Sequence, residues 1–230
     1  MSTSVAGSST TSRPTASPLN SPSRPSWVSG VGRTGGASAT RGLFVGGGRE
    51  AFERAAALSA RVNVKLTGEA ARTIVCYLDP AEFRSTWLGN KAIYRARLAM
   101  ADGGRLIILA PGVSAFGEDP RIDATIRRYG YRGATRTAEL VASGELAVDL
   151  AGAAHLAHGS TEGRFTVIYA AGGLTRAEVE SVGYEYEDPR ELMRRYAPST
   201  LADGWNERGG ERFYFIRNPA LGLWSNRIIS

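Results

Sequence analysis

Lys91 is the residue whose type and surroundings most directly indicate chemistry. Apolar side chains recur at helical spacing over residues 80–101 and predict one long amphipathic helix with an apolar stripe. The stripe consists of Phe83, Trp87, Tyr94 and Leu98. At about 100° per residue, Lys91 falls within about 60° of Trp87 and Tyr94, at the border of the stripe. A cation is therefore expected beside aromatic rings.

Arg84 and Arg95 are expected beside Lys91, so that three cations form a ridge along the edge of the buried face. No acidic residue on this ridge neutralises them. The ridge has two interpretations. In the first, the stem of Lys91 packs on Trp87 while its ammonium group reaches water. In the second, Lys91 is a binding or catalytic lysine that points into a cleft and meets an anionic ligand.

The two histidines, His155 and His158, are three residues apart, a spacing that can place both on one helical face, as for metal ligands. No carboxylate accompanies them at a fixed spacing, so the pair alone does not predict a metal site. Gly, Ser and Thr follow His158, which favours either a loop near the ligand cleft or a loop histidine with a structural hydrogen bond. No Ser-His-Asp triad or pair of catalytic carboxylates stands out.

Cysteine content and hydropathy indicate a protein of a reducing, aqueous compartment. The single cysteine, Cys76, excludes an intramolecular disulfide and a cysteine-built metal site. It lies in residues 73–78, an apolar run that predicts a buried strand, so we expect an inert thiol. No run approaches the length that spans a membrane. We therefore expect a cytoplasmic protein without a membrane partner.

The net charge of +6 is unevenly distributed. Residues 1–42 contain four arginines and no acid, whereas the remainder has 24 basic and 22 acidic residues. The part that is expected to fold is therefore nearly neutral and lacks the basic surface that nucleic-acid binding requires. We expect no nucleic-acid partner.

Composition divides the chain at residue 42. Residues 1–42 are rich in Ser, Thr, Pro, Gly and Ala and cannot bury enough apolar surface to fold, so they are predicted to be a disordered tail. Residues 43–230 alternate between predicted strands and helices, which indicates an α/β domain of three layers with a mostly parallel sheet. The predicted strands are 73–78, 105–110, 164–171, 182–187 and 211–216, and the predicted helices are 49–62, 80–101, 121–129, 134–143, a capped helix from Thr175 and 188–196.

Several short motifs follow one another along this domain. They are residues 43–46 (LFVG), 55–59 (AAALS), 87–91 (WLGNK), 101–104 (ADGG), 106–111 (LIILAP), 129–132 (YGYR) and 156–158 (LAH). Their order resembles the C-terminal half of the nickel-dependent lactate racemase family, over about residues 43–196. The helix lysine and the DGG segment before the apolar strand are the most specific parts of the resemblance.

The resemblance implies a racemase or epimerase of 2-hydroxy acids. In this family a nickel-pincer nucleotide accepts a hydride from the carbinol carbon and returns it to the other face, while a histidine removes the hydroxyl proton. The family's C-terminal half supplies a helix lysine to the substrate, and the matching residue is Lys91. Trp87 matches an aromatic residue of the same pocket. Leu88 replaces a polar residue of the lactate enzymes, which argues against lactate itself, and His158 is expected to line the substrate site.

The resemblance covers only one half of the family's enzymes. The residues that anchor the cofactor, bind nickel and shuttle protons belong to the N-terminal half, which residues 1–42 do not supply. The chain is therefore expected to be a half enzyme, which by itself binds no cofactor and no metal and needs an N-terminal-half partner. The alternative is a non-catalytic module that binds a small anion or a partner protein.

Overall fold

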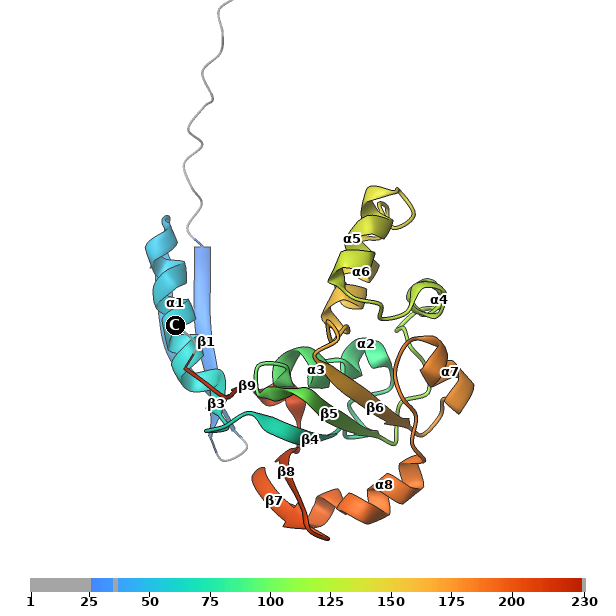
Figure 1. Ribbon diagram of the computed structural model, residues 1–230. Helices are drawn as coiled ribbons and strands as arrows, with labels where there is room; N and C mark the ends of the chain where they lie inside the picture. Colours follow the sequence, from blue (N-terminus) through green and yellow to red (C-terminus); the bar gives the residue numbers. More distant parts are fainter. Residues whose placement is uncertain (1–25, 35–36, 229–230) are drawn as a thin grey trace, which may run out of the picture.

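The computed structural model describes residues 26–34 and 37–228, and its centre is a five-stranded sheet (Figure 1). The strand order is β6-β5-β4-β8-β7. The strands are β4 (Ala71–Tyr77), β5 (Met100–Ala110), β6 (Phe165–Ala171), β7 (Gly204–Arg208) and β8 (Glu211–Ile216). Only β7 runs antiparallel to its neighbour, so the prediction of a mostly parallel sheet is confirmed.

Helices cover both faces of this sheet, which confirms the predicted three layers (Figure 1). The helix on one face is α8 (Pro189–Tyr196). The helices on the other face are α2 (Thr86–Gly89), α3 (Lys91–Ala96), α4 (Pro120–Tyr129), α5 (Ala134–Ala142), α6 (Leu150–His158) and α7 (Arg176–Ser181). Short 3₁₀ turns lie at Pro198–Thr200 and Pro219–Leu221.

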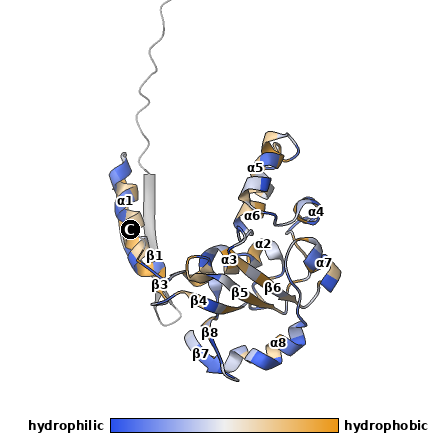
Figure 2. Cartoon of the chain, viewed as in Figure 1, coloured by the Kyte–Doolittle hydropathy of each residue, from blue (hydrophilic) through white to orange (hydrophobic). Residues whose placement is uncertain are grey.

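Apolar residues on alternate positions of the strands fill the two cores. In β5, Leu106 and Ile108 face the layer with α3, whereas Ile107 and Leu109 face α8. Residues 106–110 of β5 are buried on both faces and are all apolar, as expected of a parallel strand covered on both sides. In Figure 2, β5 and β6 are largely hydrophobic, while the surface helix α4 is largely hydrophilic.

A smaller unit precedes the sheet. Strands β1 (Ser26–Thr34) and β2 (Ala37–Gly46) pair antiparallel, and α1 (Arg49–Asn63) packs on them. The chain then enters β3 (Val64–Leu66), which pairs in parallel with β9 (Leu223–Ser225). Of the tail that was predicted to be disordered, residues 1–25 and 35–36 lie outside the described residues, while the rest of it belongs to this hairpin.

The prediction of one long helix over residues 80–101 is wrong. A turn after Asp79 ends at Phe83, Ser85 caps the short helix α2 by accepting from the N–H of Leu88, and Asn90 separates α2 from α3. Residues from Met100 onward belong to β5 rather than to the end of a helix. Gly103 and Gly104 therefore lie inside this strand.

The buried face of α2 and α3 also differs from the predicted stripe. Its buried residues are small or aliphatic: Gly89, Ala92, Ile93 and Ala96. Trp87 and Tyr94 are only half-buried, and Leu98, beyond the end of α3, is exposed. The sheet approaches so closely that an added Cβ at Gly89 would clash with Tyr169 and Leu78. Only small side chains fit there, and the aromatic residues turn toward neighbouring helices instead.

The remaining predicted elements lie close to their predicted positions, with one exception, whereas α6 and β7 were not predicted. The capping box of α7 forms as predicted, with Thr175 and Glu178 as its two members. Residues 182–187 were predicted as a strand, but only Glu185 pairs there, as an isolated bridge to Ile168. No helix of the described part of the chain is long and apolar enough to cross a membrane.

Candidate functional site

Helix α2 begins beside the loop that follows β5, at the edge where the parallel strands end. Ser85 and Ala115 form an isolated parallel bridge. The N–H groups of Thr86 and Trp87 donate to the carbonyl oxygens of Ala115 and Phe116 over 3.0 and 2.9 Å. Ligands of open parallel sheets bind at this edge. The backbone therefore fixes Trp87 where a ligand site is expected.

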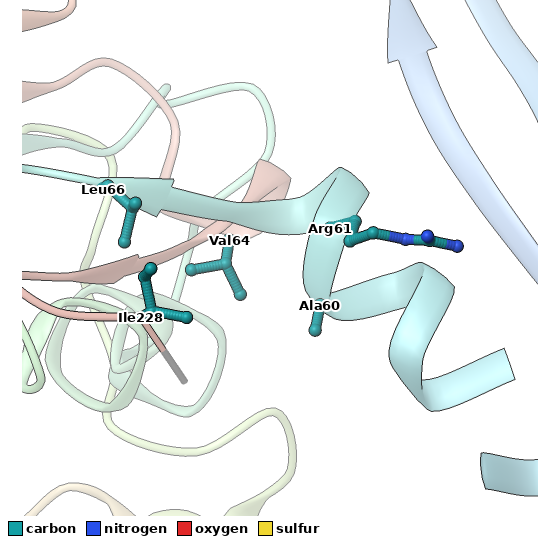
Figure 3. A pocket seen from close by; sticks show the side chains of 5 residues that line it. All are labelled: Ala60, Arg61, Val64, Leu66 and Ile228. Atoms are coloured by element: carbon teal, nitrogen blue, oxygen red, sulfur yellow. The ribbon is translucent and has the colours of Figure 1, made fainter. Parts of the chain in front are cut away.

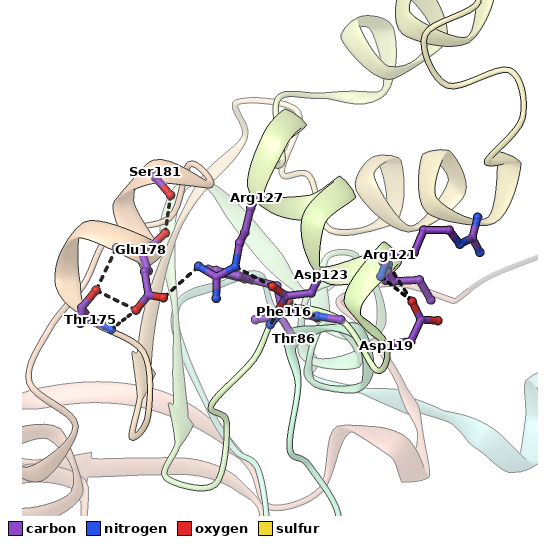
Figure 4. A network of polar contacts seen from close by, with 11 residues as sticks. Thr86, Phe116, Asp119, Arg121, Asp123, Arg127, Thr175, Glu178 and Ser181 are labelled. Carbon is purple, nitrogen blue, oxygen red and sulfur yellow. Dashed lines mark hydrogen bonds and ion pairs between the residues drawn. The ribbon is translucent and has the colours of Figure 1, made fainter.

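A charged network holds the same loop from behind (Figure 4). Asp123 of α4 accepts the N–H groups of Phe116 and Gly117 over 2.7 and 3.2 Å. Arg127 donates to Asp123 over 2.6 Å and to Glu178 of α7 over 2.8 Å. The network thus ties two helices to the loop that positions α2.

This network lowers the pKa values of the carboxyl groups of Asp123 and Glu178. Burial opposes the ionisation of Asp123, but the hydrogen bonds from Arg127 and from two backbone N–H groups hold its pKa below the usual value. The pKa of Glu178 falls to about 2, because the backbone and hydroxyl of Thr175 and then Arg127 donate to its carboxylate. The ionised forms of both groups therefore stabilise the folded state.

The indole ring of Trp87 lies flat against the imidazole ring of His155 on α6. Their centroids are 4.3 Å apart and the planes differ by 29°. The Oη atom of Tyr131 is 3.0 Å from Nε2 of His155 and 2.9 Å from Oγ1 of Thr86. Oγ1 of Thr86 also donates to the carbonyl oxygen of Phe116 over 3.0 Å. A polar chain therefore runs from His155 to the loop after β5.

Burial keeps His155 neutral. The residue is 8% exposed. Loss of solvation, and to a lesser extent the neighbouring His158, lower the pKa of His155 to about 4. At neutral pH its ring has one N–H and one unprotonated nitrogen.

A second group of buried polar side chains packs against this series of hydrogen bonds through Tyr131. Nδ2 of Asn90 donates to Oη of Tyr184 over 3.0 Å, and Tyr184 donates to the carbonyl oxygen of Gly159 over 2.9 Å. The ring of Tyr184 stacks between the rings of Tyr131 and Tyr169. Within the described residues, Oδ1 of Asn90 and Oη of Tyr169 are buried without a hydrogen-bond partner. This group fixes α2, α3 and the end of α6 against one another.

Lys91 is half-buried, and its ammonium group lies 5.8 Å from the centre of the Phe83 ring. The expected aromatic neighbour was Trp87, so the structure places the cation over a different ring. Arg95 donates to the carbonyl oxygen of Gly222 over 3.2 Å, and Arg97 donates to that of His158 over 2.7 Å. In the described part of the chain Lys91 has no such partner and no ion pair.

The other expected site residues lie along the same interface. His158 is exposed at the end of α6 and its ring lies 5.7 Å from that of Tyr94. Leu88 is half-buried and packs against the core. The structure thus brings Trp87, Tyr94 and both histidines to the contact between α2–α3 and α6, with Lys91 on the same helical segment.

Sequence reasoning missed His155, Tyr131 and Thr86 as parts of this site. They come from α6, a loop and α2, and no local spacing links them. One available signal was Tyr131 within the YGYR motif, because a tyrosine between helices needs a hydrogen-bond partner when buried.

The donor set does not fit a metal ion. No group of three or more His, Cys, Asp or Glu side chains that could hold one occurs in the described ranges. His155 is held by Trp87 and Tyr131, and His158 lies one helical turn away without a carboxylate partner. Within the described ranges, protein side chains alone therefore do not form a metal site.

A cavity at the junction of α1 with β3 is less suited to chemistry (Figure 3). It is lined by Ala60, Arg61, Val64, Leu66 and Ile228. In Figure 3 the side chain of Arg61 points away from Val64, Leu66 and Ile228. No polar groups converge there, in contrast to the contact between α2 and α6.

The fold has solved counterparts. A protein from Thermotoga maritima matches with a TM-score of 0.59 and 22% identity, over 82% of this chain and 48% of that protein. The lactate racemase apoprotein from Thermoanaerobacterium thermosaccharolyticum matches with a TM-score of 0.55 and 12% identity, over 80% of this chain and 42% of that protein. No protein-family model and no curated protein matches the sequence. The chain therefore shares a fold with less than half of each protein, and its structural relationship to lactate racemase is distant.

Proposed function

We propose that this chain is the substrate-binding domain of a 2-hydroxy acid racemase or epimerase, and that Lys91 binds the substrate carboxylate. The observation that carries the proposal is the state of the Lys91 ammonium group. It is half-buried over an aromatic ring and lacks an acceptor in the described part of the chain, whereas Arg95 and Arg97 each donate to a backbone carbonyl oxygen. A cation held at a ligand-binding edge without an acceptor is suited to an anionic ligand.

The surrounding residues supply shape rather than further charge. Trp87 offers a ring wall whose orientation His155 fixes by stacking. Leu88 gives an apolar position where a substrate side chain larger than a methyl group finds contact. His158, exposed at the end of α6, lies at the rim. Together these residues suit a small acid with an apolar substituent.

The proposal assigns no redox step to this chain. The described residues contain no cluster that could hold a metal ion by itself. In this proposal the hydride-accepting cofactor of such an enzyme would be bound by another domain or polypeptide. The contribution of the chain is to hold the carboxylate and to orient the carbinol carbon. Fixed orientation of this kind is a large part of catalysis between bound groups.

The test compares Lys91→Met with the unchanged chain, using Arg84→Met as a control at an exposed neighbouring cation. Binding of glycolate is measured by NMR titration. A charge-assisted hydrogen bond contributes about 1.5–3 kcal/mol, so Lys91→Met should weaken binding by about ten- to a hundredfold. Thermal unfolding should be unchanged, because methionine keeps the packing of the stem.

Equal affinity in the two chains would refute the role of Lys91. In a second experiment, racemisation is measured after a cofactor-bearing N-terminal-half protein is added. Lys91→Met should abolish most of the racemisation. Anion binding that depends on Lys91, without racemisation in that assembly, would indicate the non-catalytic anion-binding module instead.

A further inference from the structure

The hydrogen bonds between α6 and the loop after β5 fix the proton positions on His155. This series of hydrogen bonds has three contacts. They join the Phe116 carbonyl to the Thr86 hydroxyl, the Thr86 hydroxyl to the Tyr131 hydroxyl, and the Tyr131 hydroxyl to Nε2 of His155. Each contact needs one proton. The carbonyl oxygen has none, so the single hydroxyl proton of Thr86 is used there.

The remaining two protons follow by elimination. Oγ1 of Thr86 has already donated, so the proton in the contact between Thr86 and Tyr131 comes from the phenol. Tyr131 then has no proton left for His155, and Nε2 of His155 must donate to it. His155 is therefore the Nε2–H tautomer, and because its pKa is about 4, Nδ1 is unprotonated at neutral pH.

Nδ1 is an acceptor with no partner in the described residues. The buried polar atoms without a partner in that part of the chain are Asn90 Oδ1, Arg97 Nε and Tyr169 Oη, and Nδ1 of His155 is not among them. Nδ1 is therefore not completely enclosed, although the residue as a whole is only 8% exposed. The ring cannot turn freely, because Trp87 stacks on it and Tyr131 lies edge-on to it.

We infer that His155 is a further binding residue of the proposed site, whose Nδ1 accepts a hydrogen bond from the α-hydroxyl group of a 2-hydroxy acid. The identity of the ligand rests on the proposed function, whereas the tautomer rests on the hydrogen bonds alone. An unprotonated nitrogen repels a carboxylate and accepts from a hydroxyl. Lys91 has the opposite preference and comes four residues after Trp87, which stacks on His155. In this proposal Lys91 takes the carboxylate of the ligand and His155 takes its hydroxyl group.

The test is ¹⁵N NMR of the imidazole rings in the full chain, which is simple because the protein has two histidines. His158→Gln assigns the remaining signals to His155. The unliganded protein should give the pattern of the Nε2–H tautomer. The chain is then titrated with glycolate and with acetate, which lacks the hydroxyl group. Glycolate should shift the Nδ1 signal of His155, and acetate should not.

His155→Gln gives the matched variant, because its amide can still donate to Tyr131 but leaves no acceptor at the Nδ1 position. It should weaken glycolate binding about tenfold, as expected for one lost hydrogen bond, and leave acetate binding unchanged. His155→Asn, which retains an acceptor near Nδ1, should recover part of the affinity even if it lowers stability.

The possible failures are distinguishable. An Nδ1–H tautomer would overturn the role of His155 and leave the proposed function standing. The same conclusion would follow if glycolate and acetate gave equal responses and Lys91→Met abolished the binding of both anions. If neither anion perturbs the site, the proposed function fails and this inference fails with it.

Discussion

The two faces of the central sheet bury different kinds of side chains. Under α8 the core is aliphatic and aromatic, and its polar groups are confined to the rim, where Glu211 accepts from Arg105, Arg195 and Tyr196. Under α2, α3 and α6 the core includes hydroxyl, amide and imidazole groups that bond to one another. Unpartnered polar atoms of the described residues also lie on this second face.

This difference separates stability from chemistry. An apolar layer stabilises by burial and needs no particular orientation of its atoms. A buried polar layer adds little net stability, but its hydrogen bonds fix the orientation of each ring. The α8 face therefore holds the sheet together, and the opposite face orients Trp87 and His155.

The largest expected effect is on the α8 face. Phe215→Ala removes a fully buried ring from this core. We expect a loss of about 3–5 kcal/mol in the free energy of unfolding, measured by urea denaturation. Phe52→Ala, at an exposed ring on α1, should change it little. Glycolate affinity of the folded Phe215→Ala chain should be unchanged, and a loss of affinity would contradict the separation of the two faces.

A smaller loss is expected from Asp123→Ala, which leaves the N–H groups of Phe116 and Gly117 without their acceptor. The cost should be about 2 kcal/mol in the free energy of unfolding. Unlike Phe215→Ala, it should also increase hydrogen exchange in the loop after β5. The control is Glu139→Ala, which breaks an exposed ion pair on α5. Equal effects of the two variants would show that the network does not hold the loop.

Thr86→Val removes the middle hydroxyl of the chain between Tyr131 and the Phe116 carbonyl at nearly constant volume. We expect a loss of about 1–2 kcal/mol in the free energy of unfolding, because the Phe116 carbonyl oxygen loses one of its two donors and Tyr131 loses its hydrogen bond to Thr86. The imidazole signals of His155 should also change, since its proton position no longer follows from the chain. Thr86→Ser keeps the hydroxyl and should preserve the tautomer. An unchanged spectrum in Thr86→Val would show that Tyr131 and His155 do not depend on Thr86.

The smallest effect concerns pH and Glu178. Its pKa is about 2 in the folded chain against 4.5 for the free side chain, so its ionised form stabilises the protein above pH 4.5. This contribution is lost as the pH falls toward 2. Glu178→Gln should lower stability at pH 7 by about 0.5 kcal/mol and flatten the acid limb of the stability curve. Glu180→Gln, on the same helix, should leave that limb unchanged, and identical curves for both variants would refute the assignment.

Sequence patterns predicted the sheet better than the helices that carry the site. Strands β8 and β5 each end in a continuous apolar run, over residues 213–216 and 106–110, and a run of that kind has few alternatives to a buried strand. Residues 80–101 have a helical period, yet contacts with the loop after β5 and the cap by Ser85 divide the segment. Helical periodicity records the local preference of a segment and cannot record a neighbouring loop that replaces part of its hydrogen bonds.

The sequence by itself determined the α/β class, the four parallel strands β4, β5, β6 and β8, the α7 capping box and the presence of a lysine among aromatic residues. These depend on local propensity and apolar period, which neighbouring residues set. Only the tertiary structure decided that Phe83 lies under Lys91, that Trp87 stacks on His155, and that Tyr131 links His155 to Thr86. Those contacts join residues up to 68 positions apart, and their geometry follows from how the layers pack rather than from any local pattern.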